Sequence, residues 1–187
     1  MKQYITRKGE FDATHRIMFE RIKCYNLHGH RFGYELTFSF SEEYKLGYAI
    51  DFKEIKRVAC AFIDDKFDHG AILNPKDDIV IDCCKKLNSK LWLMSLFGEG
   101  EDCNPSAEHI SKELFLAISL LMNDTNLTLE NVRLFETPNC WVDANNGCIT
   151  IQERKNFDKV HHDEIMNYRN EKGVFEYDER MCNVQNN

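Results

Sequence analysis

Residues 28–40, HGHRFGYELTFSF, decide the fold of this chain. The even positions hold two histidines and then only aromatic or aliphatic residues, whereas the odd positions are glycine or mostly polar. Alternation over this length predicts a β-strand with one buried face. Upstream, Phe11, Ala13 and His15 follow the same period. The two segments are therefore predicted to pair as an antiparallel hairpin with a long loop between them.

Helical periodicity appears in two places further along the chain. Asp51 and Glu54 open the first predicted helix with a capping-box pattern. Asn104-Pro105-Ser106 opens the second, whose apolar stripe continues to Leu121. Further strands are predicted over residues 90–97, 132–135 and 148–151, the last following a hairpin turn at Asn146-Gly147. This order predicts an α+β fold with two helices on one face of a mostly antiparallel sheet.

Length and composition limit the class of protein. The 187 residues suit one domain, predicted over residues 1–151, followed by a polar and partly ordered extension over residues 152–187. A net charge of −7 gives no overall attraction to nucleic acid or to an anionic membrane. The opening MKQYITRKGEFDATH does not resemble a secretory signal, and the eight cysteines contain no C-x-x-C pair. We therefore expect a soluble, cytoplasmic protein with reduced cysteines.

The histidines of the predicted hairpin point to a metal. His28 and His30, two residues apart on a strand, project from the same face, and His15 is in phase on the neighbouring strand. An H-x-H pair alone more often means two partly buried histidines, but the third in-phase histidine favours an ion. Three imidazoles with a free fourth position are typical of catalytic zinc.

Three more side chains are candidates with competing interpretations. Cys24 would be a fourth ligand that makes the zinc structural, a reactive thiolate beside the ion, or an inert buried cysteine. Asp68 and His69 would form a proton shuttle, although an Asp-His dipeptide is more often a solvated turn. Glu136, at the end of a strand, would bind the amino and N–H edge of a pterin or guanine, or would be a surface carboxylate.

Taken together, these motifs resemble the family of 6-pyruvoyl- and 6-carboxy-tetrahydropterin synthases over residues 2–151. The matching blocks, in chain order, are FDATH (11–15), CYNLHGH (24–30), IDF (50–52), FDH (67–69) with LN (73–74), NPSAE (104–108) and FET (135–137). The resemblance implies the T-fold, in which subunits join their sheets into a barrel. Two trimers then stack into a homohexamer, with active sites between subunits.

The resemblance also implies roles for the candidates. His15, His28 and His30 would bind Zn²⁺, and Cys24 would be the catalytic thiol, with Asp68 and His69 completing its relay. Glu136 would anchor the pterin of 7,8-dihydroneopterin triphosphate. The zinc would act as a Lewis acid on the side-chain hydroxyls.

The C-x-x-x-H-G-H spacing is similar to that of bacterial 6-carboxy-5,6,7,8-tetrahydropterin synthase. The implied reaction releases acetaldehyde and triphosphate on a route to 7-deazaguanines such as queuosine. The alternatives are triphosphate elimination to a 6-pyruvoyl product, or a non-catalytic module stabilised by zinc. Ser106 replaces the common threonine, and residues 75–103 are longer than in compact members. Arg16, Lys23 and Arg31 flank the ligands as candidates for the triphosphate, although surface basic residues are the more ordinary interpretation.

Overall fold

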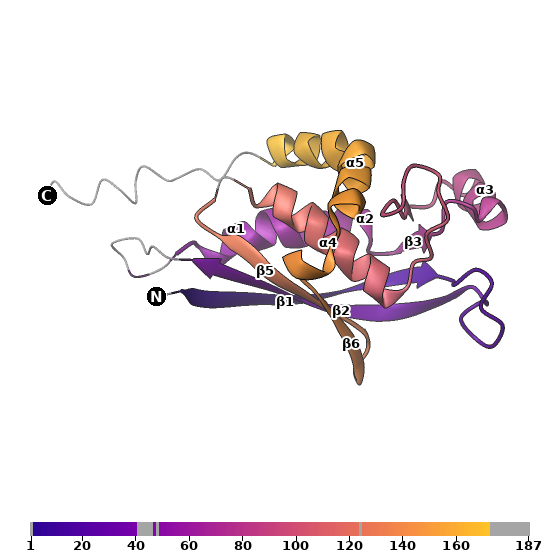
Figure 1. Cartoon of the computed structure of the whole chain (residues 1–187), viewed down its shortest axis with the longest axis horizontal. Coiled ribbons are helices and arrows are strands. Elements are labelled where there is room, and N and C mark those ends of the chain that lie inside the picture. The colour runs from indigo at the N-terminus through magenta and orange to yellow at the C-terminus, as the bar shows by residue number, and fades with distance from the viewer. Residues whose placement is uncertain (1, 41–46, 48, 124, 173–187) are drawn as a thin grey trace, which may run out of the picture.

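A single mixed sheet forms the framework of the molecule (Figure 1). The computed structural model describes residues 2–40, 47, 49–123 and 125–172. The strands are β1 (Gln3–His15), β2 (His28–Phe40), β3 (Gly70–Leu73), β4 (Leu91–Leu93), β5 (Thr128–Thr137) and β6 (Cys140–Ala144). They lie in the order β4-β3-β1-β2-β5-β6, with β1, β2, β5 and β6 antiparallel and β3 and β4 parallel to β1. The predicted α+β class is confirmed.

β1 and β2 form the long hairpin that the alternation predicted. Their register pairs Phe11 with Phe32 and His15 with His28. The Phe11 and Phe32 rings stack with centroids 5.2 Å apart, and both side chains are buried. Because a slip of one residue would turn every buried side chain outward, burial of this face fixes the register. The same register places the histidines of the two strands side by side.

The two predicted helical segments cover one face of this sheet (Figure 1). The first consists of α1 (Phe52–Ile55), the π-helical turn η1 (Lys56–Cys60) and α2 (Ala61–Lys66), and the second is α4 (Ala107–Leu121). Asp51 and Ser106 cap their first turns by accepting hydrogen bonds from backbone N–H groups. The positions of both helices are therefore confirmed.

A further helix, α3 (Asp78–Lys86), lies on the opposite face of β3 and β4 and was not predicted. α3 and β3 form a second, smaller hydrophobic core on this face. Ile72 of β3 belongs to the main core, whereas the next residue, Leu73, packs with Ile81 of α3. α3 has only nine residues, of which Ile81 alone is buried, and a run this short shows no clear helical period in the sequence. The strand predicted over residues 90–97 is limited to Leu91–Leu93, because the N–H of Ser95 donates to a buried side chain of α4 instead of a neighbouring strand.

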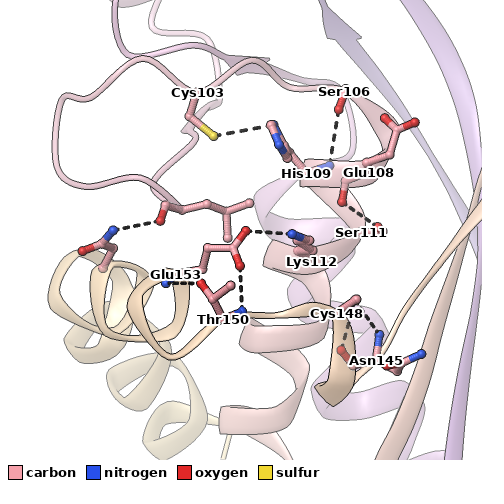
Figure 2. Close-up of polar contacts among 12 residues, drawn as sticks. Cys103, Ser106, Glu108, His109, Ser111, Lys112, Asn145, Cys148, Thr150 and Glu153 are labelled. Carbon is pink, nitrogen blue, oxygen red and sulfur yellow. Dashed lines mark hydrogen bonds and ion pairs between the residues drawn. The ribbon is translucent and has the colours of Figure 1, made fainter.

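The C-terminal part differs most from expectation. Residues 152–187 were predicted to be a polar extension, but residues up to 171 belong to α5 (Ile151–Glu171), whose Phe157 and Ile165 are fully buried in the main core. Figure 2 shows the contacts that join α5 to α4: Glu153 pairs with Lys112 at 2.7 Å and forms a capping box with Thr150. This helix is therefore part of the domain. Residues 173–187 of the predicted extension lie outside the described part of the chain.

The hairpin predicted at Asn146-Gly147 is wrong. The β5–β6 hairpin turns earlier, at residues 138–139, and Asn146–Cys148 is a short 3-10 turn, η2. The Asn145 side chain accepts a hydrogen bond from the Gly147 N–H at 2.9 Å, so polar contacts within the turn replace strand pairing. No strand forms over residues 148–151, because Cys148 ends η2, Thr150 caps α5 and Ile151 begins it. None of the described helices is long and apolar enough to cross a membrane.

Candidate metal centre and active site

His15, His28 and His30 converge at the loop end of the β1–β2 hairpin. One ring nitrogen of each lies within 4.8 Å of one nitrogen of each of the others. Ring centroids are 4.6 Å apart for His15 and His28, and 5.0 Å for His28 and His30. This follows from the register, which places His15 opposite His28, and from the two-residue period of β2. The spacing suits three nitrogens bound to one ion.

Two of these imidazoles are oriented by backbone carbonyls. Nδ1 of His15 lies 2.8 Å from the Pro105 carbonyl oxygen, and Nδ1 of His28 lies 2.7 Å from that of Asn26. A carbonyl oxygen can only accept a hydrogen bond, so each Nδ1 carries the proton and each Nε2 keeps a lone pair. Histidines that bind metals are commonly held this way through the other ring nitrogen.

Nε2 of His15 is buried and, within the described residues, has no hydrogen-bond partner. A buried polar atom without a partner is costly, and a metal ion would satisfy it. Burial lowers the pKa of His15, and its hydrogen bond to Pro105 opposes this effect only in part. The ring is therefore held in the neutral form that binds a metal. The three histidines fit a zinc ion by their spacing, and His15 and His28 also by the orientation of their rings.

Glu136 reaches the same place from the end of β5. Its Oε1 lies 3.7 Å from Nε2 of His15, and its side chain is one-third exposed. The carboxylate thus borders His15 and has one side open to solvent. It is placed to contact a molecule that also reaches the ion.

Cys24 lies in the loop between β1 and β2 and is exposed. Its carbonyl oxygen accepts a hydrogen bond from the Ile17 N–H at 2.7 Å, which closes the loop across its base. The compact group of possible metal ligands in the described chain contains the three histidines and does not include the Cys24 sulfur.

Asp68 and His69 form a bonded pair. Oδ2 of Asp68 lies 2.6 Å from Nδ1 of His69, and Oδ1 accepts a hydrogen bond from the Asp12 N–H at 2.8 Å. Burial works to raise the pKa of Asp68, but the hydrogen bonds from Asp12 and His69 outweigh it and lower that pKa. The ionised carboxylate therefore holds the proton on Nδ1 of His69. The His69 side chain is 79% exposed, so its other nitrogen is accessible to a substrate.

A cavity of about 640 Å³ borders His69 and lies next to His30. Asp12, Thr14, Gly29 and Arg31 also line it, and these residues belong to the face of the β1–β2 hairpin opposite His15 and His28. Val80, Cys83 and Cys84 of α3 cover the side of this cavity next to the Asp68–His69 pair. A cavity of this size can hold a small organic ligand.

The sequence did not predict several contacts that hold residues around the site in place. Arg16 and Arg31, candidates for a triphosphate, are instead paired with Asp77 and Asp12. The contact of His15 with Pro105 could not be predicted, because the oxygen belongs to the backbone and no particular side chain is required for it. The motif NPSAE (104–108), interpreted as a helix start and as a block matching the family, contains the residue whose carbonyl orients His15.

Comparisons with known proteins agree with these features. Residues 4–147 match the family model described as 6-pyruvoyl tetrahydropterin synthase. A Rickettsia felis protein named 6-carboxy-5,6,7,8-tetrahydropterin synthase is 39% identical over 146 residues, which covers 74% of this chain and 97% of the relative. A Haemophilus influenzae protein of the same name is 30% identical over 141 residues, covering 72% of this chain and 92% of the relative.

Solved structures share the fold. The 6-pyruvoyl tetrahydropterin synthase of Caenorhabditis elegans superposes with a TM-score of 0.56 at 18% identity, covering 78% of this chain and 96% of that one. An uncharacterised protein from Wolinella succinogenes gives a TM-score of 0.62 at 16% identity, covering 78% and 99%. The T-fold expected for the subunit is confirmed.

Proposed function

Since this chain belongs to the 6-pyruvoyl tetrahydropterin synthase family, we propose that it is a zinc-dependent 6-carboxy-5,6,7,8-tetrahydropterin synthase. Its substrate would be 7,8-dihydroneopterin triphosphate, and its products 6-carboxytetrahydropterin, acetaldehyde and triphosphate. The observation that carries the proposal is the buried Nε2 of His15, without a partner in the described structure and beside His28 and His30.

The three histidines would hold Zn²⁺ through their lone-pair nitrogens and leave it one open coordination position. A zinc ion there supplies Lewis-acid stabilisation of negative charge on the side-chain oxygens of the substrate. The carbonyls of Pro105 and Asn26 keep His15 and His28 in the required tautomer. Because these carbonyls belong to the backbone, the geometry is set before substrate arrives.

Glu136 would bind the pterin ring. A carboxylate accepts two parallel hydrogen bonds from a ring N–H and the adjacent amino group, which fixes both the position and the orientation of the ring. The open side of Glu136 and its 3.7 Å separation from Nε2 of His15 support this role. Anchored there, the pterin would direct its side chain towards the metal centre.

Proton transfer would fall to Cys24 and to the Asp68–His69 pair. The thiolate of Cys24 would take up and return a proton at the side-chain carbons of the substrate. His69 would exchange a proton with the other hydroxyl through Nε2, since its Nδ1–H is held by Asp68.

Two features favour the carboxy product. The relatives from Rickettsia and Haemophilus carry that name, and the cysteine lies four residues before the first histidine of the H-G-H motif. The 6-pyruvoyl synthase is the second candidate, because it uses the same substrate and the family model bears its name. We further propose a cytoplasmic homohexamer in which sheets join into a barrel, serving 7-deazaguanine synthesis of the queuosine type.

Product analysis tests the reaction. Incubation of the zinc-loaded protein with 7,8-dihydroneopterin triphosphate is expected to release acetaldehyde and triphosphate in equal amounts. A 6-pyruvoyl product without acetaldehyde would establish the alternative synthase. Cys24→Ala is expected to keep its zinc and lose turnover, whereas a non-catalytic module in which Cys24 closes the site would lose zinc with this substitution and show no turnover in any form.

A further inference from the structure

Arg16, the residue after His15, is bound firmly to a part of the chain far away in sequence. Its NH2 group donates to Oδ1 of Asp77 at 2.6 Å, and its Nε donates to Oδ2 of the same carboxylate. Asp77 is only 2% exposed and lies directly before α3. A two-point arginine–carboxylate contact fixes both the position and the plane of the guanidinium. Arg16 is therefore a rigid point on the surface beside the metal centre.

The loop that carries Cys24 packs against the Arg16 side chain. The Arg16 guanidinium lies 5.1 Å from the ring centroid of Tyr25, the residue after Cys24. Beside it, the Ile17 N–H donates to the Cys24 carbonyl at 2.7 Å. The contact between Arg16 and Tyr25 thus connects the chain next to His15 with the chain next to Cys24. The position of Cys24 thus depends on where the Arg16 side chain is held.

A buried amide network supports the same loop from below. Asn104 bonds both backbone groups of Met18, accepting from its N–H at 2.8 Å and donating to its carbonyl at 3.1 Å. Asn74, fully buried, donates to Asn104 at 3.0 Å. Pro105, the next residue, is the one whose carbonyl orients His15. The loop and the metal centre therefore share one rigid support.

We propose that Arg16 is a positioning residue that sets the place of Cys24 relative to the three histidines, an inference that rests on the proposed function. It acts through Tyr25 and through its own attachment to Asp77. The Nε and NH2 donors that could together bind a phosphate are occupied by Asp77, which favours positioning over substrate binding. Its loss should therefore reduce kcat and leave KM nearly unchanged.

The chain contains a matched control. Arg133 on β5 also makes a two-point contact with a carboxylate, Asp143, and lies 5.3 Å from the ring centroid of Trp141. The test compares Arg16→Met with Arg133→Met and with the conservative Arg16→Lys. The measurements are kcat, KM, zinc content, and amide hydrogen exchange of peptides spanning residues 17–25.

Arg16→Met is expected to lower kcat about tenfold or more, since small misplacements of a reacting group have effects of this size. We expect KM to stay within about a factor of two, zinc content to be unchanged, and peptides 17–25 to exchange at least about tenfold faster. Arg16→Lys should recover part of kcat, and Arg133→Met should match the wild type. Arg16→Met leaves the buried carboxylate of Asp77 without its partner and could unfold the protein. Tyr25→Leu is therefore a second variant, and it removes the ring that contacts Arg16. Tyr25→Phe retains this ring and is expected to keep the wild-type exchange rate.

Four results would overturn the inference. In Arg16→Met these are a higher KM with unchanged kcat, which would assign Arg16 to phosphate binding, a loss of zinc in proportion to the loss of rate, or an effect equal to that of Arg133→Met. The fourth is unchanged kcat and unchanged exchange in Tyr25→Leu. If the wild type showed no turnover, the proposed function would fail, and faster exchange in Arg16→Met alone would still uphold the anchoring of the Cys24 loop.

Discussion

Nδ1 of His15 lies 2.8 Å from the carbonyl oxygen of Pro105, ninety residues further along the chain. This contact joins the end of β1 to the segment before α4 and leaves Nε2 of His15 as a buried acceptor beside His28 and His30. An ion bound there would therefore link the hairpin to the helical layer, and its removal should affect stability as well as chemistry.

Metal removal should lower the melting temperature. An ion present at 1,000 times its dissociation constant stabilises the folded state by about 4 kcal/mol, or roughly 10 °C for a domain of this size. A chelator is expected to produce this loss and added zinc to reverse it, as measured by differential scanning calorimetry. His28→Ala should abolish the response, while His162→Ala, on the exposed side of α5, should preserve it. A chelator-insensitive wild type would exclude a tightly bound ion.

Gly9 faces the ring of Tyr34 across the β1–β2 hairpin. A Cβ at residue 9 would lie 2.2 Å from the Tyr34 hydroxyl oxygen, and that ring is buried. Gly9→Ala should therefore destabilise the protein by about 1–3 kcal/mol, the usual cost of overpacking. Gly33→Ala is the matched control, because its Cβ would meet Phe135 at an ordinary 3.5 Å. Equal free energies of unfolding for the two variants in urea would contradict this account of Gly9.

The packing of α5 predicts that the domain extends past residue 151. Phe157 is fully buried between α5 and the main core, so Phe157→Ala should lower the free energy of unfolding by about 3–5 kcal/mol. Ile151, which is 76% exposed on the same helix, provides the comparison. Ile151→Ala should change the free energy of unfolding by less than about 0.5 kcal/mol. Urea denaturation measures both, and a small effect at Phe157 would mean that α5 is dispensable.

A carboxylate on α5 should make stability depend on pH. His161, and after it Lys66 of α2 at 2.5 Å, lower the pKa of Glu164 to about 2. A lowered pKa means stabilisation that is present above about pH 4.5 and lost as pH falls towards 2. Glu164→Gln should therefore destabilise the protein at neutral pH, by about 1 kcal/mol because the side chain is partly exposed.

The difference in free energy of unfolding between the wild type and Glu164→Gln should vanish in acid. Glu99→Gln, which removes the loose 4.0 Å contact with Lys159 on the same helix, should show no difference at any pH. Chemical denaturation between pH 7 and 2.5 measures the profile. A pH-independent gap between wild type and Glu164→Gln would contradict the assignment.

The hairpin and the histidine cluster could be predicted because they depend on local periodicity. Alternation fixes which face of β1 and β2 is buried, and the phase of His15 with His28 follows from it. The Asp68–His69 contact was foreseen only as one alternative, since adjacent residues bond only when the backbone turns suitably. Here His69 adopts a left-handed φ of +56°, which no sequence pattern signalled.

The supporting parts could not be predicted because they depend on distant contacts. The Pro105 carbonyl is a backbone atom, and Arg16 meets Asp77 only after the chain has crossed the sheet. α5 was taken for an extension because its few buried residues are widely spaced among charged ones. Asn146-Gly147 is typical of a hairpin, but the Thr150–Glu153 capping box that follows starts a helix instead.

X-ray absorption at the zinc edge of the substrate-free protein tests the central claim most directly. Three imidazoles and an open position predict a first shell of nitrogen and oxygen at about 2.0–2.1 Å, with no sulfur. A zinc–sulfur distance of about 2.3 Å that disappears in Cys24→Ala would show that the thiol closes the site, and would contradict the account.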